Sequence, residues 1–151
     1  MENKKLRILT IVTTALVLLS MYMIFFYLPI MRSGSGEVLD SSFRIFYFHM
    51  PIAITAYLAF FIVFAASVMQ LRSHDAKWDI YARSAAEIGV IFALLVLITG
   101  SIWARATWGW YWIWEPRLTT SLALFLVYVT YLLLRQAIEE PESRARLAAV
   151  F

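Results

Sequence analysis

Four long apolar stretches decide what this chain can fold into. They cover residues 6–28, 43–71, 82–103 and 118–134. Each is long enough to cross a bilayer, which takes about 20 apolar residues in a helix. Because a backbone inside a bilayer must satisfy its own hydrogen bonds, such stretches form helices. We therefore expect an all-α fold, a polytopic membrane helical bundle with four transmembrane helices, in which residues 1–151 form a single membrane domain.

The composition excludes several other classes of protein. The chain is 62% hydrophobic and 15% charged, whereas a soluble domain rarely exceeds about half apolar residues. The first apolar stretch lacks a small-residue cleavage site, so we interpret it as a retained span and not as a cleaved signal. The basic residues form no cluster that would bind nucleic acid. Cysteine is absent, which excludes disulfides, thiolate metal sites and covalent haem attachment by a CxxCH motif.

The basic residues also predict the orientation in the cell (cytoplasmic) membrane, because they collect on its cytoplasmic side. We expect both termini, a loop at 72–81 and a tail at 135–151 in the cytoplasm, and outer loops at 29–42 and 104–117. Nine basic residues then lie inside and four outside. The nine are Lys4, Lys5, Arg7, Arg72, Lys77, Arg83, Arg135, Arg144 and Arg146, and the four are Arg32, Arg44, Arg105 and Arg117.

The second outer loop contains a series of tryptophans. The stretch 103–117 reads WARATWGWYWIWEPR, and from Trp108 to Trp114 every second residue is tryptophan. A helix would scatter these side chains around its circumference, whereas an extended segment would place all four on one face. We expect a flat aromatic surface at the outer edge of the membrane, closed by the charges of Glu115 and Arg117.

His49 is predicted to lie on the same side of the membrane as this aromatic loop. An imidazole can ligate haem iron, and a flat array of indoles suits the flat porphyrin. The guanidinium groups of Arg44 and Arg117 match the geometry of haem propionates. These residues together make haem the candidate ligand.

Each of these residues also has a simpler interpretation. Tryptophan and tyrosine collect at the interfaces of membrane proteins in general, and Arg44 and Arg117 can extend to lipid phosphates. A histidine at a helix end is often only a hydrogen-bonded polar residue. The alternative is therefore a structural or assembly subunit that its tryptophans anchor in lipid. An electron-transfer subunit is a further rival, although no span carries a facing pair of histidines. Nothing resembles a nucleophile or a hydrolytic site, so we do not expect an enzyme.

Three blocks of sequence resemble a known family. They are SFRIFYFHMP at 42–51, LITGSIW at 97–103 and WGWYWIWEPRLT at 108–119. They resemble the haem-handling membrane proteins of cytochrome c biogenesis, in particular the CcmC haem-delivery family with its tryptophan-rich WWD motif. The resemblance implies that haem b is bound non-covalently and transiently at the outer face and delivered to a haem chaperone or maturation complex. The implied partners are membrane lipid, a haem chaperone and subunits of an ABC-type transporter.

The resemblance also implies roles for single residues. His49 matches an axial ligand of the haem iron, and Arg44 matches a basic residue before that ligand. Glu115 stands where the motif has aspartate, and Tyr111 where it usually has tryptophan. The full set of haem-binding residues implied in this way is His49, Trp103, Trp108, Trp110, Tyr111, Trp112, Trp114, Glu115, Arg117 and Arg44.

The second axial ligand is missing from this chain. Members of the family usually have six spans and a second histidine in a later outer loop. His74 follows His49 by 25 residues, or about 37 Å along a helix at 1.5 Å per residue, so the two cannot bind one iron. Met50 adjoins His49, and Met31 lies in the first outer loop. We therefore expect a second polypeptide, or a second copy of this chain, to supply the ligand.

Overall fold

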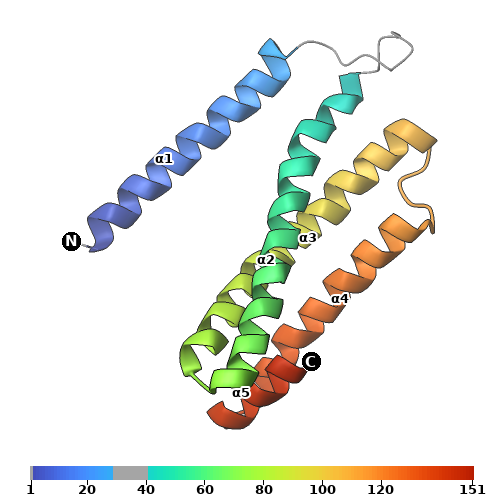
Figure 1. The fold of residues 1–151 in the computed structure, drawn as a ribbon. Coiled ribbons are helices and arrows are strands. Elements are labelled where there is room, and N and C mark those ends of the chain that lie inside the picture. Colours follow the sequence, from blue (N-terminus) through green and yellow to red (C-terminus); the bar gives the residue numbers. More distant parts are fainter. Residues whose placement is uncertain (1, 29–40) are drawn as a thin grey trace. The chain divides into compact units, whose positions relative to one another are not determined.

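The computed structural model describes residues 2–28 and 41–151, and every regular element in these residues is helical. The elements are α1 (Glu2–Tyr22), the π-helical turn η1 (Met23–Tyr27), the 3-10 turn η2 (Ser41–Arg44), α2 (Ile45–Ser73), α3 (Ala76–Trp108), α4 (Pro116–Ala137) and α5 (Pro141–Val150) (Figure 1). Four helical segments are long and apolar enough to cross a membrane: Asn3–Tyr27, Ile45–Ser73, Ala76–Trp108 and Pro116–Ala137. The predicted fold class is therefore confirmed.

The chain divides into two compact units, residues 1–47 and residues 48–151. In the first unit the side chains of α1 are exposed, and the Arg44 guanidinium donates a hydrogen bond to the Phe25 carbonyl oxygen. The predicted outer loop at 29–42 lies outside the described residues except for its last two positions, and Met31 lies outside them too. That the whole chain forms a single domain stays a prediction.

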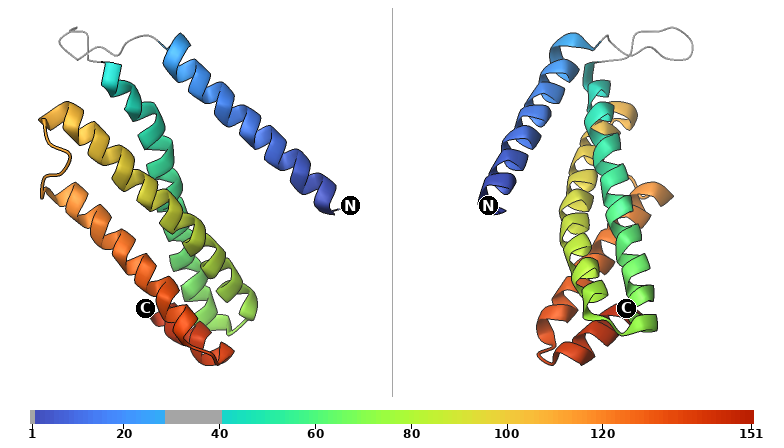
Figure 2. Two further views of the ribbon diagram at one scale, coloured as in Figure 1. Left: turned by 180° about the vertical axis from the view of Figure 1, so that it is seen from behind. Right: turned by 60° about the vertical axis from the view of Figure 1, so that its left-hand side comes forward.

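In the second unit α2, α3 and α4 run together as long helices (Figure 2). Close approach of membrane helices is favoured by small side chains in the interface. At the centre, the Phe60 ring of α2 stacks on the Tyr128 ring of α4, with centroids 3.8 Å apart. A Cβ on Gly89 of α3 would lie 2.6 Å from the Phe60 ring, so a side chain there would force that ring to move. The other small buried residues of α2 and α3 are Ala53, Ala56, Ala59, Ala66, Ala82, Ala85, Ala86, Ala93 and Ala104.

The turn between α2 and α3 is shorter than the predicted loop at 72–81. Only His74 and Asp75 separate the two helices. His74 takes a left-handed conformation with φ 55°, and the Asp75 carboxylate accepts a hydrogen bond from the Lys77 amide at 3.0 Å, which caps α3. The Lys77 side chain also bonds this carboxylate and lowers its pKa. Because a helix can continue beyond the bilayer, the bounds of the cytoplasmic loop at 72–81 stay a prediction.

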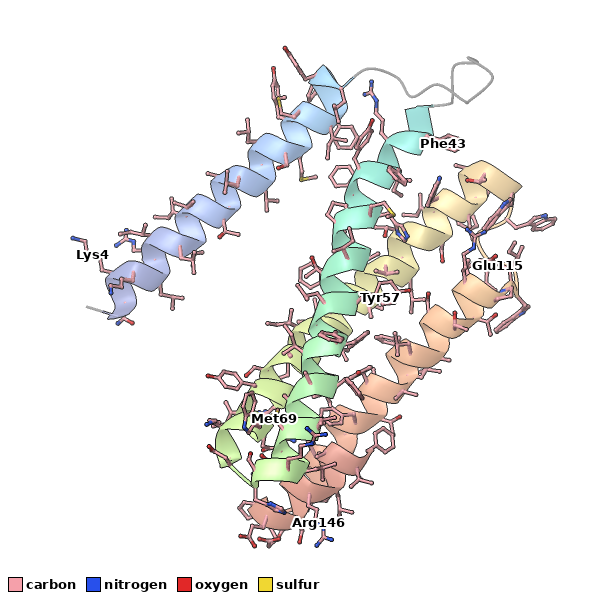
Figure 3. The ribbon with its side chains drawn as sticks, viewed as in Figure 1. Lys4, Phe43, Tyr57, Met69, Glu115 and Arg146 are labelled. Atoms are coloured by element: carbon pink, nitrogen blue, oxygen red, sulfur yellow. The ribbon has the colours of Figure 1, made fainter. Side chains whose placement is uncertain are left out.

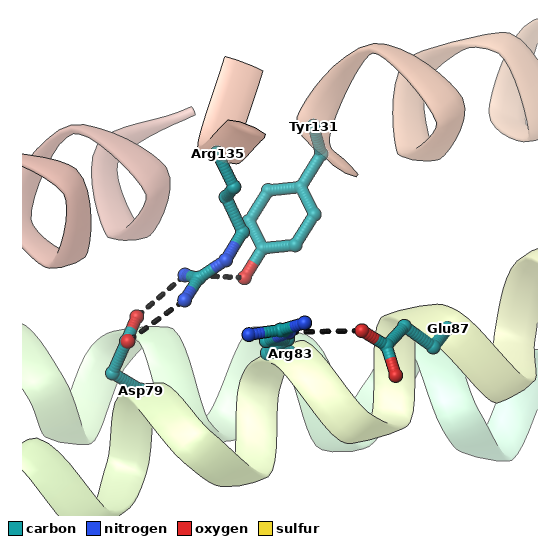
Figure 4. Close-up of polar contacts among 5 residues, drawn as sticks. All are labelled: Asp79, Arg83, Glu87, Tyr131 and Arg135. Atoms are coloured by element: carbon teal, nitrogen blue, oxygen red, sulfur yellow. Dashed lines mark hydrogen bonds and ion pairs between the residues drawn. The ribbon is translucent and has the colours of Figure 1, made fainter. Parts of the chain in front are cut away.

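An ion pair joins α3 to α4 near this turn. The Arg135 guanidinium donates two hydrogen bonds to the Asp79 carboxylate, one of them at 2.7 Å, and a third to the Tyr131 hydroxyl at 3.4 Å (Figure 4). Arg135 is buried. The nearby pair of Arg83 and Glu87 lies on the exposed surface of α3. Because a buried charge without its partner is costly, the pair between Asp79 and Arg135 fixes how α3 and α4 meet at this end.

The short helix α5 packs against the same end of the unit. Ala148 of α5 belongs to the same buried cluster as Val63 of α2 and Ala86 of α3. Glu140 caps α5, because its carboxylate accepts hydrogen bonds from the amides of Glu142 and Ser143. Hydrogen bonding by the Ser143 side chain, and then by these two amides, lowers the pKa of Glu140. The second unit is therefore closed at this end, while its other end carries the tryptophan loop.

Candidate functional site

The helix before the tryptophan loop is longer than predicted. α3 runs to Trp108, where Gly109 ends it in a left-handed conformation with φ 82°, and the Gly109 amide donates to the Arg105 carbonyl oxygen at 3.1 Å. This is a common helix ending, and glycine favours it because it has no side chain. The segment without helix therefore covers only residues 109–115, and the bounds of the predicted outer loop at 104–117 stay a prediction. Residues 104–107 are compatible with a helix, and Ala104 is buried in it.

The tryptophans do not share one face, so the prediction of a flat surface was wrong. Trp108 and Trp112 line a cavity, whereas the side chains of Trp110 and Trp114 are 70% and 76% exposed. The rings of Trp112 and Trp114 meet edge to face at 81°. The reason is that Trp108 is still helical and the chain reverses at Gly109, so the alternation of an extended strand is never set up.

The cavity lies among α2, α3, α4 and the loop that joins α3 to α4. Its volume is about 680 Å³, within the range of about 300–1,000 Å³ that is typical of small-molecule sites. Tyr57 of α2 and Glu115, just before α4, are two of the residues that line it (Figure 3). The others are His49, Met50, Ala53, Ile54, Val96, Leu97, Gly100, Ser101, Trp103, Ala104, Thr107, Trp108, Trp112, Arg117, Leu118, Thr120 and Ser121.

His49 is half-buried on α2 and contacts a single turn of α3. Its Nδ1 atom lies 2.9 Å from the Thr99 hydroxyl oxygen. Its ring centroid lies 5.6 Å from that of Trp103. A Cβ on Gly100 would lie 3.1 Å from His49 Cε1, so the ring packs directly against the backbone of α3 at this glycine.

The charged residues of the site lie at the start of α4. Arg117 Nε donates a hydrogen bond to Glu115 Oε2 at 3.1 Å, and the Arg117 side chain is 77% exposed. The guanidinium also lies 5.7 Å from the centre of the Trp108 ring. Because exposed ion pairs contribute little free energy, this guanidinium can turn toward an anionic ligand at small cost.

Two buried polar atoms at the cavity have no hydrogen-bond partner among the described residues. They are Trp112 Nε1, a donor, and Glu115 Oε1, an acceptor. Buried polar atoms are normally paired, so both suit contact with a bound molecule or water. A ligand with carboxylates would satisfy Trp112 Nε1, but it would leave the Glu115 oxygen without a donor.

The residues that line the cavity fit haem in most respects. A flat apolar macrocycle suits the indole rings and the apolar helix walls. Its carboxylate arms suit the exposed guanidinium, and a metal at its centre suits the imidazole. In the part of the chain that the structure describes, no group of three His, Cys, Asp or Glu residues could hold a bare metal ion. Haem would leave the buried Glu115 Oε1 without a donor.

The structure brings together six of the ten residues that the sequence suggested. His49, Trp103, Trp108, Trp112, Glu115 and Arg117 all line the cavity. Trp110, Tyr111 and Trp114 are exposed and do not line it, and Arg44 belongs to the first unit. Sequence reasoning missed Thr99 and Gly100, although both lie in the block at 97–103. A polar residue next to glycine in an apolar span was the available signal.

Comparison with known proteins gives consistent matches. Residues 1–151 match the family described as Heme exporter protein C. The protein of that name from Rhodobacter capsulatus is 36% identical over 126 residues, which are 83% of this chain and 50% of the relative. The one from Bradyrhizobium diazoefficiens is 39% identical over 71% of this chain and 41% of its own length. The one from Escherichia coli K12 is 31% identical over 73% of this chain and 45% of its own length. The chain thus spans about half the length of these relatives.

Proposed function

The chain belongs to the Heme exporter protein C family, and from this premise we propose that it binds haem at the outer face of the membrane and delivers it for cytochrome c biogenesis. The observation that carries the proposal is the single cavity that holds His49, three tryptophans and Arg117 together. The protein is a multi-pass membrane protein with four candidate spans. The proposed acceptor is a haem chaperone or a maturation complex.

His49 is the proposed ligand of the haem iron. When bound, haem supplies a metal centre that accepts an imidazole nitrogen and two carboxylates that accept hydrogen bonds. Trp103, Trp108 and Trp112 would contact the porphyrin through their rings. All three line the cavity with His49, so one flat molecule can contact them together. The binding would be non-covalent, because the chain has no cysteine, and this suits a cargo that must be released.

Arg117 is the proposed partner of a haem carboxylate, and Trp112 Nε1 is a second donor. Arg117 is exposed and lines the cavity, and a guanidinium binds a carboxylate with two parallel hydrogen bonds. Glu115 orients Arg117 through the hydrogen bond of 3.1 Å. Arg44 stays a proposed carboxylate partner on the strength of the family resemblance alone, because it belongs to the first unit.

A second axial ligand would have to come from outside residues 1–151. Its two histidines are His49 and His74, and they lie near opposite ends of α2. Met50 also lines the cavity, but it adjoins His49 and is poorly placed to reach the other face of the same ring. We propose a separate polypeptide as the first source of the ligand and a second copy of the chain across a twofold axis as the next.

The proposed orientation places both termini in the cytoplasm and the cavity outside. It depends on the excess of basic residues on one side, nine against four. The further proposed partners are membrane lipid and subunits of an ABC-type transporter. We propose a carrier without catalytic residues.

A second candidate function is a structural subunit whose tryptophans only anchor it in lipid. The exposure of Trp110 and Trp114 favours it, because exposed tryptophans at the end of a membrane helix suit the lipid interface. The burial of the Trp112 indole nitrogen in the cavity does not favour it.

Haem titration of the purified protein in nanodiscs, followed by the Soret band, separates the two functions. We expect the parent to bind haem and His49→Ala to bind it at least about tenfold more weakly, because the loss of an axial ligand costs well over 1.4 kcal/mol. His74→Ala is the matched control and should bind like the parent. Thermal melts of all three proteins would show whether they fold. Equal haem binding by the parent and His49→Ala would refute the assignment, and a parent without a Soret band would favour the lipid anchor.

A further inference from the structure

We propose that Thr99 is a positioning residue, which fixes the tautomer and orientation of the His49 ring so that Nε2 is the nitrogen offered to a ligand in the cavity. The inference rests on the proposed function, since it assumes that His49 binds the haem iron. Thr99 itself does not line the cavity. It would therefore act only through His49.

The tautomer follows from the hydrogen bonds of the Thr99 hydroxyl. This hydroxyl has one proton to donate and lone pairs that accept. Its oxygen lies 2.7 Å from the carbonyl oxygen of Leu95, and a carbonyl oxygen can only accept. The Thr99 proton is therefore used in that bond, and at 2.9 Å from His49 Nδ1 the hydroxyl oxygen must be the acceptor. Nδ1 then carries the proton in the neutral ring, and the lone pair is on Nε2.

The orientation follows from the other contacts of the ring with the same turn of α3. At Gly100 the ring lies against the backbone, where a Cβ would be 3.1 Å from Cε1 and 4.0 Å from Nε2. The Trp103 ring packs beside it, with the two ring planes inclined at 57°. Thr99, Gly100 and Trp103 therefore contact the imidazole from one turn of α3. Rotation of the ring would break the hydrogen bond to Thr99.

A partner of this kind changes how a histidine binds a metal. When one ring nitrogen donates a hydrogen bond, the other is fixed as the ligand atom and becomes a stronger base. The loss of such a partner typically weakens metal binding by about 10–100-fold. The Thr99 hydroxyl is neutral, so it strengthens the ligand less than a carboxylate would. We therefore expect an effect near the lower limit, about tenfold.

Three substitutions at two threonines separate this role from a general effect on the helix. Thr99→Val removes the hydroxyl and nearly keeps the shape, and Thr99→Ser restores a hydroxyl. Thr130→Val is the matched control, because the Thr130 hydroxyl donates to the Leu126 carbonyl oxygen at 2.8 Å in the same way but lies away from the cavity on α4.

The first measurement uses the ligand-free protein. In a His74→Gln background His49 is the only histidine, so the nitrogen NMR spectrum of protein labelled with ¹⁵N-histidine reports its tautomer directly, at a pH where the ring is neutral. We expect the proton on Nδ1 in the parent, in Thr99→Ser and in Thr130→Val, and a mixture of tautomers in Thr99→Val. A proton on Nε2 in the parent would overturn the proposal even if Thr99→Val fails to fold.

The second measurement is haem affinity by Soret titration of the same proteins. We expect Thr99→Val to bind about tenfold more weakly than the parent, with Thr99→Ser restored and Thr130→Val unchanged. If the parent binds haem and Thr99→Val matches it in affinity and tautomer, the positioning role is refuted and the proposed function stands. If the parent binds no haem but the tautomer changes in Thr99→Val, the proposed function is refuted and the positioning of His49 by Thr99 is upheld.

Discussion

The segment from Trp108 to Trp114 has two pairs of tryptophans that alternate in sequence but differ in environment. Trp108 and Trp112 line the cavity with His49. Trp110 and Trp114, each two residues further on, are more than two-thirds exposed. The indole nitrogen of Trp112 is buried. The exposed Trp114 ring contacts the Trp112 ring edge to face. One short segment therefore carries an inner pair, Trp108 and Trp112, that lines the cavity and an outer pair, Trp110 and Trp114, that is exposed.

The largest effect that distinguishes the pairs should come from replacing the inner one. Trp108→Leu together with Trp112→Leu keeps the apolar character but removes two flat rings. Aromatic stacking is worth about 0.5–1.5 kcal/mol per pair beyond buried area, so the loss should be about 1–3 kcal/mol, or about 5- to 150-fold in Kd for haem. Soret titration measures it, and the double change Trp110→Leu with Trp114→Leu is the control. An unchanged Kd would show that the inner pair does not contact haem.

The turn at Gly109, which leaves Trp108 on α3 and the other three tryptophans in the loop, offers a second, smaller test. Gly109 has φ 82° and no atom near the position of a Cβ, so a side chain there would be strained but would not clash. Gly109→Ala should lower the free energy of unfolding by about 1–2 kcal/mol. Unwinding of the last turn of α3 would relieve that strain, but it would move Trp108 out of the cavity. We expect lower thermal stability or weaker haem binding, by up to about 30-fold.

Gly109→Asn is the matched variant, because asparagine tolerates the left-handed conformation better than alanine. It should lie between the parent and Gly109→Ala in both thermal melting and haem Kd. If the alanine and asparagine variants both match the parent, the left-handed turn is not what holds Trp108 in the cavity.

The sequence alone predicts the spans well but not this division. Length and apolar composition suffice for four membrane helices, since the bilayer leaves few alternatives. α3 continues five residues beyond the span that was predicted to end at 103, because apolar composition marks the membrane and not the end of a helix. The alternation of tryptophans suggested an extended strand, whereas one glycine with positive φ was the feature that mattered.

The candidate site was predicted only in part for a similar reason. His49 and the tryptophans could be placed on one side of the membrane, but their meeting in one cavity depends on how α2 packs on α3. Thr99 is 50 residues from His49 in sequence, and no local pattern links the two. Small residues such as Gly89 and Gly100 set the helix contacts, and their roles become visible only when the opposing side chains are known.

Arg117, which lines the cavity with the inner pair, offers a third test. Arg117→Gln removes the guanidinium but keeps a polar side chain of related length. Because Arg117 is 77% exposed, its contribution is screened, and a contribution of about 0.2–1 kcal/mol, or up to about fivefold in Kd, is expected. The effect should shrink as salt is raised. Arg105→Gln is the control, since Arg105 lies over the exposed Tyr111 ring and does not line the cavity. Equal effects at both positions would indicate general surface charge and not a carboxylate contact.

The smallest effect on haem should come from the outer pair. Trp110→Leu with Trp114→Leu changes exposed side chains, so haem Kd should stay within about twofold of the parent. Tryptophans at a membrane interface prefer the headgroup level, and we expect the outer pair to lie there. In bilayers with brominated lipids, the double variant should therefore lose more of the quenchable tryptophan fluorescence than the inner double variant does. If the outer double variant instead weakens haem binding as much as the inner one, haem contacts both pairs and the division into a ligand surface and a lipid surface is wrong.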